Sequence, residues 1–259
     1  MSLLRVEALI LRNLRMGDTS RVVTVLSREV GRFGAIAKGA RDPKSRFGGS
    51  LEILSVSSLI VYFKSGRDLQ LISDGTLECE NRGLLRSSER YHHGCAVLEF
   101  LDRLLEEEAP VPEIYDLAVK VLALMEETPE GRLPYVQRAF QLRTAGWLGY
   151  TPRLDGCLVC GGSGVRYFGA AEGGLLCGRC GEHTGAHRVA DETIALLRSL
   201  CGGTLPRAPG PLACRELESI VESFLTYHID RYRPLRSLRA LNEIGELRRS
   251  APTEPPLSE

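Results

Sequence analysis

Four cysteines form the clearest local pattern of reactive side chains in this sequence. Cys157 and Cys160 make one C-x2-C pair, Cys177 and Cys180 make a second, and sixteen residues separate the pairs. Two residues between thiolates let both sulfurs reach one tetrahedral ion, and the intervening segment is long enough for a hairpin that returns the second pair. The spacing predicts a zinc ribbon with one structural Zn²⁺. A glycine follows each pair, at Gly161 and Gly181, where backbone freedom helps the chain turn around the metal.

A catalytic or redox role would need a different arrangement. A catalytic zinc keeps an open position for water, whereas four thiolates close the shell. A redox dithiol needs one C-x2-C pair beside a βαβ unit, which the pattern lacks. His183 and His187 could replace a cysteine ligand, although loop histidines are the preferred interpretation. The remaining cysteines are scattered and should pack as small apolar side chains: Cys79, Cys95, Cys201 and Cys214.

Cations make the second pattern. Lys38, Arg41, Lys44 and Arg46 lie within nine residues, in a segment that Gly39, Gly48 and Gly49 should make flexible. Such a loop can close over a phosphate backbone, although a charged loop is often only solvated surface. Residues 1–50 carry ten Lys or Arg against four acidic residues, a net charge of +6, whereas residues 81–150 carry a net charge of −3. The charge and the predicted positions add three further candidates for DNA binding: Arg12, Arg15 and Arg21.

Motifs of enzymatic chemistry are missing from the sequence. There is no G-x-x-x-x-G-K-[ST], no G-x-G-x-x-G after a predicted strand, no G-x-S-x-G and no H-E-x-x-H. The triplet Glu106–Glu108 is typical of a solvated helix end rather than a two-metal nuclease site. The pair His92–His93 should be surface or core packing rather than metal ligands. We therefore expect a binding protein and not an enzyme.

The N-terminal region has the short, β-branched, turn-punctuated pattern of a small barrel. Five strands are predicted in about 75 residues without intervening helices, which fits an SH3-like barrel or a five-stranded OB-fold. The predicted strands are 6–11, 21–26, 33–38, 51–63 and 69–77.

After residue 85 the apolar residues recur at helical spacing. Stripes run from 91 to 105, from 114 to 124 and from 136 to 148, then resume at 194–200 and 217–225. Ser87 or Ser88 should cap the first helix, and Asp191 a later one. The fold class is therefore α+β and multidomain. The predicted domains are a barrel (1–80), a helical domain in two parts (81–152 and 189–249) interrupted by a four-cysteine zinc-ribbon insert (153–188), and a disordered tail (250–259).

The overall composition is that of an ordinary globular protein, with 43% hydrophobic and 25% charged residues and no net charge. No apolar run is long enough to span a bilayer, and Arg5 and Glu7 interrupt the only early apolar stretch, so no signal peptide is expected. We expect an intracellular protein, where clustered cysteines hold a metal more often than they form disulfides.

Short motifs occur in a characteristic order. Gly17-Asp18-Thr19-Ser20, Gly31-Arg32 and Ala37-Lys38-Gly39-Ala40-Arg41 lie at the N-terminus, and Arg233-Pro234-Leu235-Arg236-Ser237 lies near the C-terminus. Between them, Phe140-Gln141-Leu142-Arg143 precedes Gly149-Tyr150-Thr151-Pro152, the first cysteine pair, and Gly173-Gly174-Leu175-Leu176-Cys177. In order and spacing the chain resembles the bacterial recombination mediator RecO of the zinc-binding, four-cysteine type, over about residues 3 to 240.

This resemblance implies an OB-fold followed by one helical domain, with Lys38 and Arg41 in the basic signature and the four cysteines around zinc. It implies a cytoplasmic, nucleoid-associated protein of DNA repair and homologous recombination that binds single- and double-stranded DNA and anneals complementary strands. It also implies work with RecR and the single-stranded-DNA-binding protein to load RecA, without a nucleotide cofactor. The family's pocket for the tail of the single-stranded-DNA-binding protein lies in the helical domain, but the sequence does not place its residues.

Two other classes remain compatible with the pattern. A zinc-ribbon transcription factor or RNA-binding factor would share the barrel and the cysteine pairs, and would bind RNA more tightly than DNA. A metallo-nuclease would cleave strands in a metal-dependent manner, for which the sequence offers no carboxylate constellation.

Overall fold

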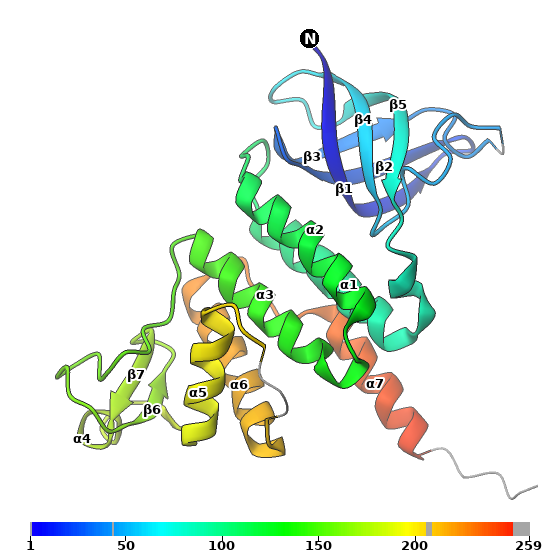
Figure 1. Cartoon of the computed structure of the whole chain (residues 1–259). Helices are drawn as coiled ribbons and strands as arrows, with labels where there is room; N and C mark the ends of the chain where they lie inside the picture. Colours follow the sequence, from blue (N-terminus) through cyan, green and yellow to red (C-terminus); the bar gives the residue numbers. More distant parts are fainter. Residues whose placement is uncertain (1, 43, 206–208, 251–259) are drawn as a thin grey trace, which may run out of the picture.

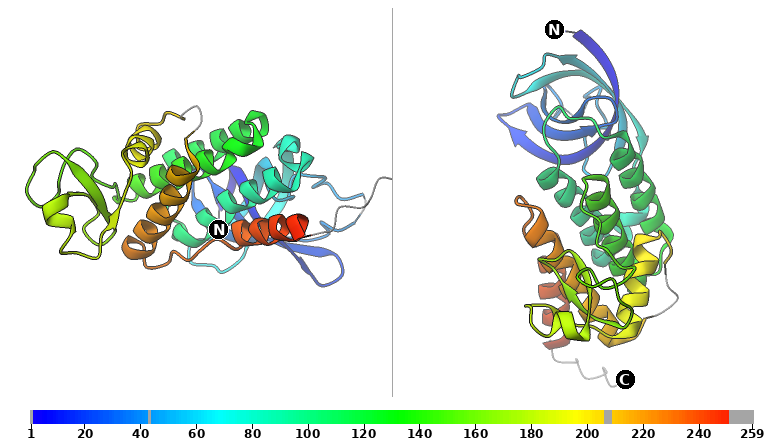
Figure 2. Two further views of the ribbon diagram at one scale, coloured as in Figure 1. Left: turned by 90° about the horizontal axis from the view of Figure 1, so that it is seen from below. Right: turned by 90° about the vertical axis from the view of Figure 1, so that its left-hand side faces the viewer.

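A computed structural model describes residues 2–42, 44–205 and 209–250 of the chain. A small β-barrel lies at one end of the molecule, a helical domain forms its middle, and a small sheet with the cysteine pairs lies at the opposite end (Figures 1 and 2). The predicted tail begins at Ser250, which is the last residue of a helix, and residues 251–259 lie outside the described part.

The barrel closes in the strand order β1-β2-β3-β5-β4, with β3 and β5 parallel and the other neighbours antiparallel. This five-stranded order is OB-like and decides between the two barrels that fit the sequence. The prediction of a strand from residue 51 is wrong, because residues 51–55 form turns and Leu54 has a φ of 70°. The strands are β1 (Ser2–Met16), β2 (Ser20–Ser27), β3 (Gly31–Ala37), β4 (Val56–Phe63) and β5 (Gln70–Cys79).

The helices follow the predicted stripes. Ser87 caps the first of them by accepting a hydrogen bond from the backbone N–H of Arg90 (3.3 Å). Asp191 is the first residue of its helix and Ala190 occupies the cap position, so that expectation is wrong by one residue. The last helix was not among the predicted stripes. The helical elements are η1 (Arg82–Arg86), α1 (Ser88–Leu104), α2 (Pro112–Glu127), η2 (Glu130–Arg132), α3 (Leu133–Trp147), α5 (Asp191–Cys201), α6 (Pro211–His228) and α7 (Arg236–Ser250).

The cysteine-rich insert contains β6 (Val165–Gly169), β7 (Gly174–Cys177), the short helix α4 (Gly178–Gly181) and β8 (His187–Arg188), in the sheet order β7-β6-β8. Because apolar residues show little periodicity in this segment of the sequence, we expect the insert to have no apolar core of its own. The structure shows that this expectation is wrong for the end of the insert nearest the helical domain. Phe168 is 1% exposed and makes an edge-to-face contact with Phe224 of α6, with ring centroids 6.2 Å apart. The insert therefore shares the core of the helical domain.

One strand joins the barrel to the helices. Val6, Ala8 and Ile10 of β1 point into the barrel, whereas Leu9 and Leu11 belong to the core of the helical domain. Successive side chains of a strand point to opposite faces, so β1 supplies both cores at once.

Two motif residues of the barrel strengthen this junction. A Cβ at Gly31 would lie 2.5 Å from the backbone oxygen of Ala109, so only glycine lets the connection after α1 approach so closely. The Arg32 guanidinium donates to the backbone oxygen of Leu105 (2.9 Å) and pairs with Asp102 (3.4 Å). The Gly31-Arg32 motif thus holds the barrel on the helical domain.

Candidate metal centre and nucleic-acid interface

The four cysteine sulfurs converge at the outer end of the insert. They all lie within 4.8 Å of one another, and the sulfurs of Cys160 and Cys177 are 3.8 Å apart. A tetrahedral zinc site with Zn–S bonds of about 2.3 Å places its sulfurs about 3.8 Å apart. The donor set and its spacing therefore fit a closed, structural metal site. His183 and His187 are exposed and are not part of this cluster.

Local backbone geometry brings the two pairs together. The backbone N–H of Cys157 donates to Gly162 (3.0 Å), and that of Gly161 donates back to Cys157 (2.8 Å), which closes the first knuckle. Gly161 has a φ of 69°, as its predicted role requires. From the sequence we expect Gly181 to supply backbone freedom for a turn around the metal, and this reason is wrong. A Cβ at Gly181 would lie 2.5–2.7 Å from atoms of Tyr167, so the glycine is needed for close packing.

The protein backbone favours an ionised sulfur in this cluster. Hydrogen bonds from backbone N–H groups, first that of Cys177 and then that of Cys160, lower the pKa of Cys157 to about 6. Sharing a hydrogen bond with Cys177 raises the pKa of Cys180 to about 12. A metal binds cysteine as thiolate, so a bound cation would replace the proton that Cys180 keeps in its hydrogen bond with Cys177.

The predicted basic loop is more ordered than its glycines indicated. Phe47 and Leu51 are 2% and 1% exposed and belong to the barrel core. The chain over residues 44–55 forms successive hydrogen-bonded turns. The expectation of a freely adaptable loop is therefore wrong for its second half. Pro43, which should limit its collapse, lies outside the described residues.

The structure divides the seven predicted DNA-binding residues into two groups. Lys38, Lys44, Arg46 and Arg15 are exposed around one end of the barrel, and the Arg46 guanidinium lies 5.4 Å from the ring centroid of Phe47. The other three have protein partners: Arg41 donates to the backbone oxygen of Gly17 (2.6 Å), Arg21 pairs with Glu52 (2.7 Å), and Arg12 pairs with Asp102 of α1 (3.4 Å). Their role in DNA binding stays a prediction.

The C-terminal motif has a structural function in this protein. Arg103 of α1 donates to the backbone oxygens of Arg233 (2.9 Å) and Pro234 (3.2 Å). The carboxylate of Glu99 accepts the backbone N–H groups of Arg236 and Ser237, both at 2.9 Å. The Arg233–Ser237 motif therefore docks the start of α7 onto α1.

Two of the three glutamates at the end of α1 also serve to join the two domains. Glu107 pairs with Arg32 (3.2 Å), and Glu108 accepts hydrogen bonds from Ser65 (2.5 Å) and the backbone of Gly66 (3.1 Å). Of the two neighbouring histidines, His92 bonds to the backbone oxygen of Ser88 (2.6 Å), and His93 is 3% exposed. Neither group resembles a catalytic centre.

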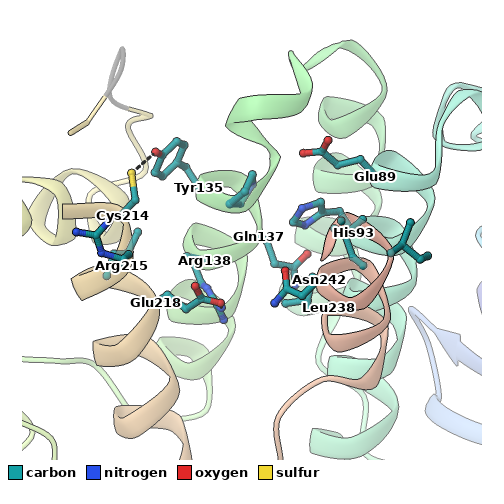
Figure 3. Close-up of a pocket in the computed structure, with 15 residues that line it drawn as sticks. Glu89, His93, Tyr135, Gln137, Arg138, Cys214, Arg215, Glu218, Leu238 and Asn242 are labelled. Atoms are coloured by element: carbon teal, nitrogen blue, oxygen red, sulfur yellow. Dashed lines mark hydrogen bonds and ion pairs between the residues drawn. The ribbon is translucent and has the colours of Figure 1, made fainter. Parts of the chain in front are cut away.

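A cleft in the helical domain was not predicted. It has a volume of about 440 Å³ and lies between α1, α3, α6 and α7 (Figure 3). Two buried polar groups have no hydrogen-bond partner within the described chain: both amide atoms of Gln137 and the Nδ1 atom of His93. Burial lowers the pKa of His93 to about 4, with a further contribution from the charge of Arg138. Apolar side chains of Leu217, Leu238 and Leu241 complete the lining.

The sequence contains a signal for this cleft. Gln137, Gln141 and Thr144 are spaced as one face of a helix and are all fully buried in α3. Polar residues at the period of an apolar stripe indicate a buried polar seam. The guanidinium of Arg138 adds a charge to this seam and pairs with Glu218 (3.1 Å) and Glu222 (3.6 Å) of α6.

No described helix combines the length and apolarity that crossing a membrane requires.

Comparisons with known proteins cover nearly the whole chain. The family model described as "Recombination protein O N terminal" matches residues 1–78, and the one described as "Recombination protein O C terminal" matches residues 85–239. Proteins named "DNA repair protein RecO" are similar to this chain over most of their length. That of Anaeromyxobacter dehalogenans is 36% identical over 95% of this chain and 99% of its own, and that of Bifidobacterium longum subsp. infantis is 33% identical over 93% and 100%.

Proposed function

Because the chain belongs to the RecO family of DNA repair proteins, we propose that it acts as a recombination mediator. In this role it binds single- and double-stranded DNA and anneals complementary strands without chemical catalysis. It acts with RecR to help load RecA onto DNA coated by the single-stranded-DNA-binding protein, in the bacterial cytoplasm at the nucleoid. The observation that carries the proposal is the match of both family models, in order, to the barrel and the helical domain.

The barrel supports DNA binding through its charge. Lys38, Lys44, Arg46 and Arg15 are exposed at one end of an OB-like barrel. Cations that neutralise phosphates release counterions and supply affinity that does not depend on base sequence. We assign the first DNA strand to this barrel surface, defined by these four residues.

The cysteine cluster supports a structural role for metal. We propose that Cys157, Cys160, Cys177 and Cys180 bind one Zn²⁺, because four thiolates with this spacing match the preferred tetrahedral zinc shell. The ion supplies folding energy to the outer end of the insert and no catalysis.

The cleft between α1, α3, α6 and α7 supports a protein partner. Its unpartnered Gln137 amide can bond to a peptide or carboxylate, the exposed Arg215 adds charge, and the leucines accept an apolar side chain. We assign this cleft to the tail of the single-stranded-DNA-binding protein. Fluorescence polarisation of a labelled tail peptide should show weaker binding for Arg215→Ala, and equal affinity for the distant control Lys120→Ala. Unchanged affinity in Arg215→Ala would count against the assignment.

Strand annealing tests the function as a whole. Complementary strands coated with the single-stranded-DNA-binding protein should form duplex faster when this protein is added, without nucleotide. A zinc-ribbon factor for RNA would instead bind an RNA strand more tightly than the DNA strand of the same sequence. Metal-dependent cleavage of either strand would overturn the proposal of a binding protein without chemistry.

A further inference from the structure

Exposed aromatic side chains lie around the end of α3. Tyr150 lies near His228 at the end of α6, and Trp147 lines a pocket with Cys201 at the end of α5. Trp147, Tyr150 and Tyr227 are 56%, 39% and 60% exposed, and within the described part of the chain they are the only large apolar residues with this exposure that are aromatic. The chain leaves α3 here toward the insert, at the left of the helical domain (Figure 1). Exposed rings at the ends of two neighbouring helices, α3 and α6, indicate a binding surface rather than scattered surface residues.

Three of the rings at this junction form a fixed row. The ring of His228 lies between Tyr227 and Tyr150, with centroid distances of 5.0 Å and 6.2 Å. Its Nε2 atom donates to the backbone oxygen of Ala170 (2.8 Å). At the end of α3, Gly149 has a φ of 92° and the backbone N–H of Tyr150 donates to Ala145 (2.8 Å). The row is therefore ordered before any ligand binds.

Unpaired positive charge flanks the rings. Arg143 lies one helical turn before Trp147, and Arg153 lies three residues after Tyr150. Both are exposed, and neither side chain bonds to another residue in the part of the chain that the structure describes. Residues 143–153 contain these two arginines and no acidic residue. Arg143, Trp147 and Thr151 also line one open pocket of about 290 Å³.

We infer that this junction surface, defined by Trp147, Tyr150, Tyr227, His228, Arg143 and Arg153, is a second binding surface for single-stranded DNA. Bases stack on exposed rings with little dependence on sequence, and free guanidinium groups bind phosphates. A protein ligand would also cover aromatic rings, but two unpaired arginines in a segment, 143–153, that contains no acidic residue favour a polyanion.

The inference rests on the proposed annealing function, because it supplies the second site for a DNA strand that annealing requires. Annealing needs two strands on one molecule, and the barrel surface accounts for only one of them. The end of α3, where the chain turns toward the insert, lies at the left of the helical domain in Figure 1, and the barrel lies at the upper right, so each strand can be held while its partner searches for register.

Tryptophan fluorescence of the full chain provides a direct test, because Trp147 is the only tryptophan. Binding of oligo(dT) should quench the emission of Trp147 and protect it from acrylamide. The same quenching should occur in the variant Lys38→Ala, Lys44→Ala, Arg46→Ala, because the junction surface is separate from the barrel surface. Emission that does not change while a labelled oligo(dT) binds, as seen by polarisation, would overturn the inference.

Variants supply the second readout. Tyr227→Ala should weaken oligo(dT) binding about tenfold in the barrel variant, since one stacked base is lost. Leu212→Ala, at the other end of α6 and 51% exposed, is the matched control and should bind normally. In annealing assays, Tyr227→Ala should slow duplex formation more than Leu212→Ala does. Equal behaviour of the two variants would contradict the inference.

The two proposals fail in different ways. If the chain does not mediate annealing, the wild-type protein will leave the rate of duplex formation unchanged, whatever Trp147 reports. If only the junction surface is wrong, the wild-type protein will anneal strands while the emission of Trp147 stays constant with DNA. Quenching by RecR and not by oligo(dT) would show that the surface binds a protein, and would also overturn the inference.

Discussion

The carboxylate of Glu99 on α1 accepts hydrogen bonds from the backbone N–H of Ser237 at 2.9 Å and from its hydroxyl at 2.8 Å. This relationship joins residues 138 positions apart and fixes the start of α7 on the helical domain. Burial raises the pKa of Glu99, but hydrogen bonds from the backbone of Ser237 and Arg236 outweigh it, so the pKa lies below its usual value. The folded state therefore prefers the ionised carboxylate.

Glu99→Gln should destabilise the protein by about 1–3 kcal/mol at pH 7, because the charged acceptor of the Arg236 and Ser237 N–H groups is lost. A lowered pKa contributes stability that is present above the unfolded value of about 4.3 and is lost as the pH falls through the folded value. Urea unfolding should thus show a difference from wild type at pH 7 that shrinks below pH about 4. Glu106→Gln, at a largely exposed carboxylate, is the control. A difference that does not depend on pH would contradict this account.

Gly31→Ala should loosen the contact between the barrel and the helices. Its Cβ would meet the Ala109 backbone at 2.5 Å, and its φ of 87° is strained for any other residue. The loss should exceed about 1 kcal/mol in the free energy of unfolding. Gly131→Ala has open space and an ordinary φ, so it should change stability by no more than about 0.5 kcal/mol. Similar urea midpoints for the two variants would show that the close approach is not important.

Metal content should be about one zinc per chain, and Cys157→Ser should lower it. Loss of the ion should increase hydrogen exchange in the two cysteine knuckles, whereas Phe168 and its strand should stay protected by their packing on α6. Cys79→Ser, at an exposed cysteine outside the cluster, should retain the metal. Wild-type protein that lacks metal and still has ordered knuckles would refute the zinc assignment.

Salt dependence should identify the barrel surface. The variant Lys38→Ala, Lys44→Ala, Arg46→Ala should reduce the log–log salt slope for single-stranded DNA by about two units, since each phosphate contact contributes about 0.7. Its stability should hardly change, because none of the three side chains pairs with an acidic residue in the described part of the chain.

An alternative DNA-binding surface would be a group of four exposed arginines near the C-terminus: Arg231, Arg233, Arg236 and Arg239. Arg231 and Arg239 lie near Glu106 (3.9 Å) and Glu243 (3.8 Å), and Arg233 bonds to the backbone of Asp230 (2.9 Å). Replacing these four by Ala should leave the salt slope nearly unchanged. If the salt slope falls in this variant and is unchanged in the barrel variant, the DNA strand binds the C-terminal arginines and not the barrel surface.

Local patterns were enough to predict much of the fold and the metal cluster. Strand and helix periods, the turn glycines and the C-x2-C spacing all act over a few residues, and the order of short motifs correctly indicated the RecO family. The four-cysteine cluster was predicted residue by residue because each pair is held by its own knuckle, and only the distance between the pairs depends on the fold.

Tertiary structure alone decided which charges are free and where the unexpected cleft lies. Arg12 counts as a candidate for DNA in the sequence, yet it pairs with Asp102, ninety positions away. No pattern in the sequence marks Arg143 and Arg153 as candidates, yet they are unpaired in the described part of the chain and lie near the exposed rings. Whether a cation binds a ligand or an internal carboxylate depends on neighbours brought together by packing. No spacing along the chain encodes those neighbours, whereas a metal knuckle or an amphipathic helix is complete within its own segment.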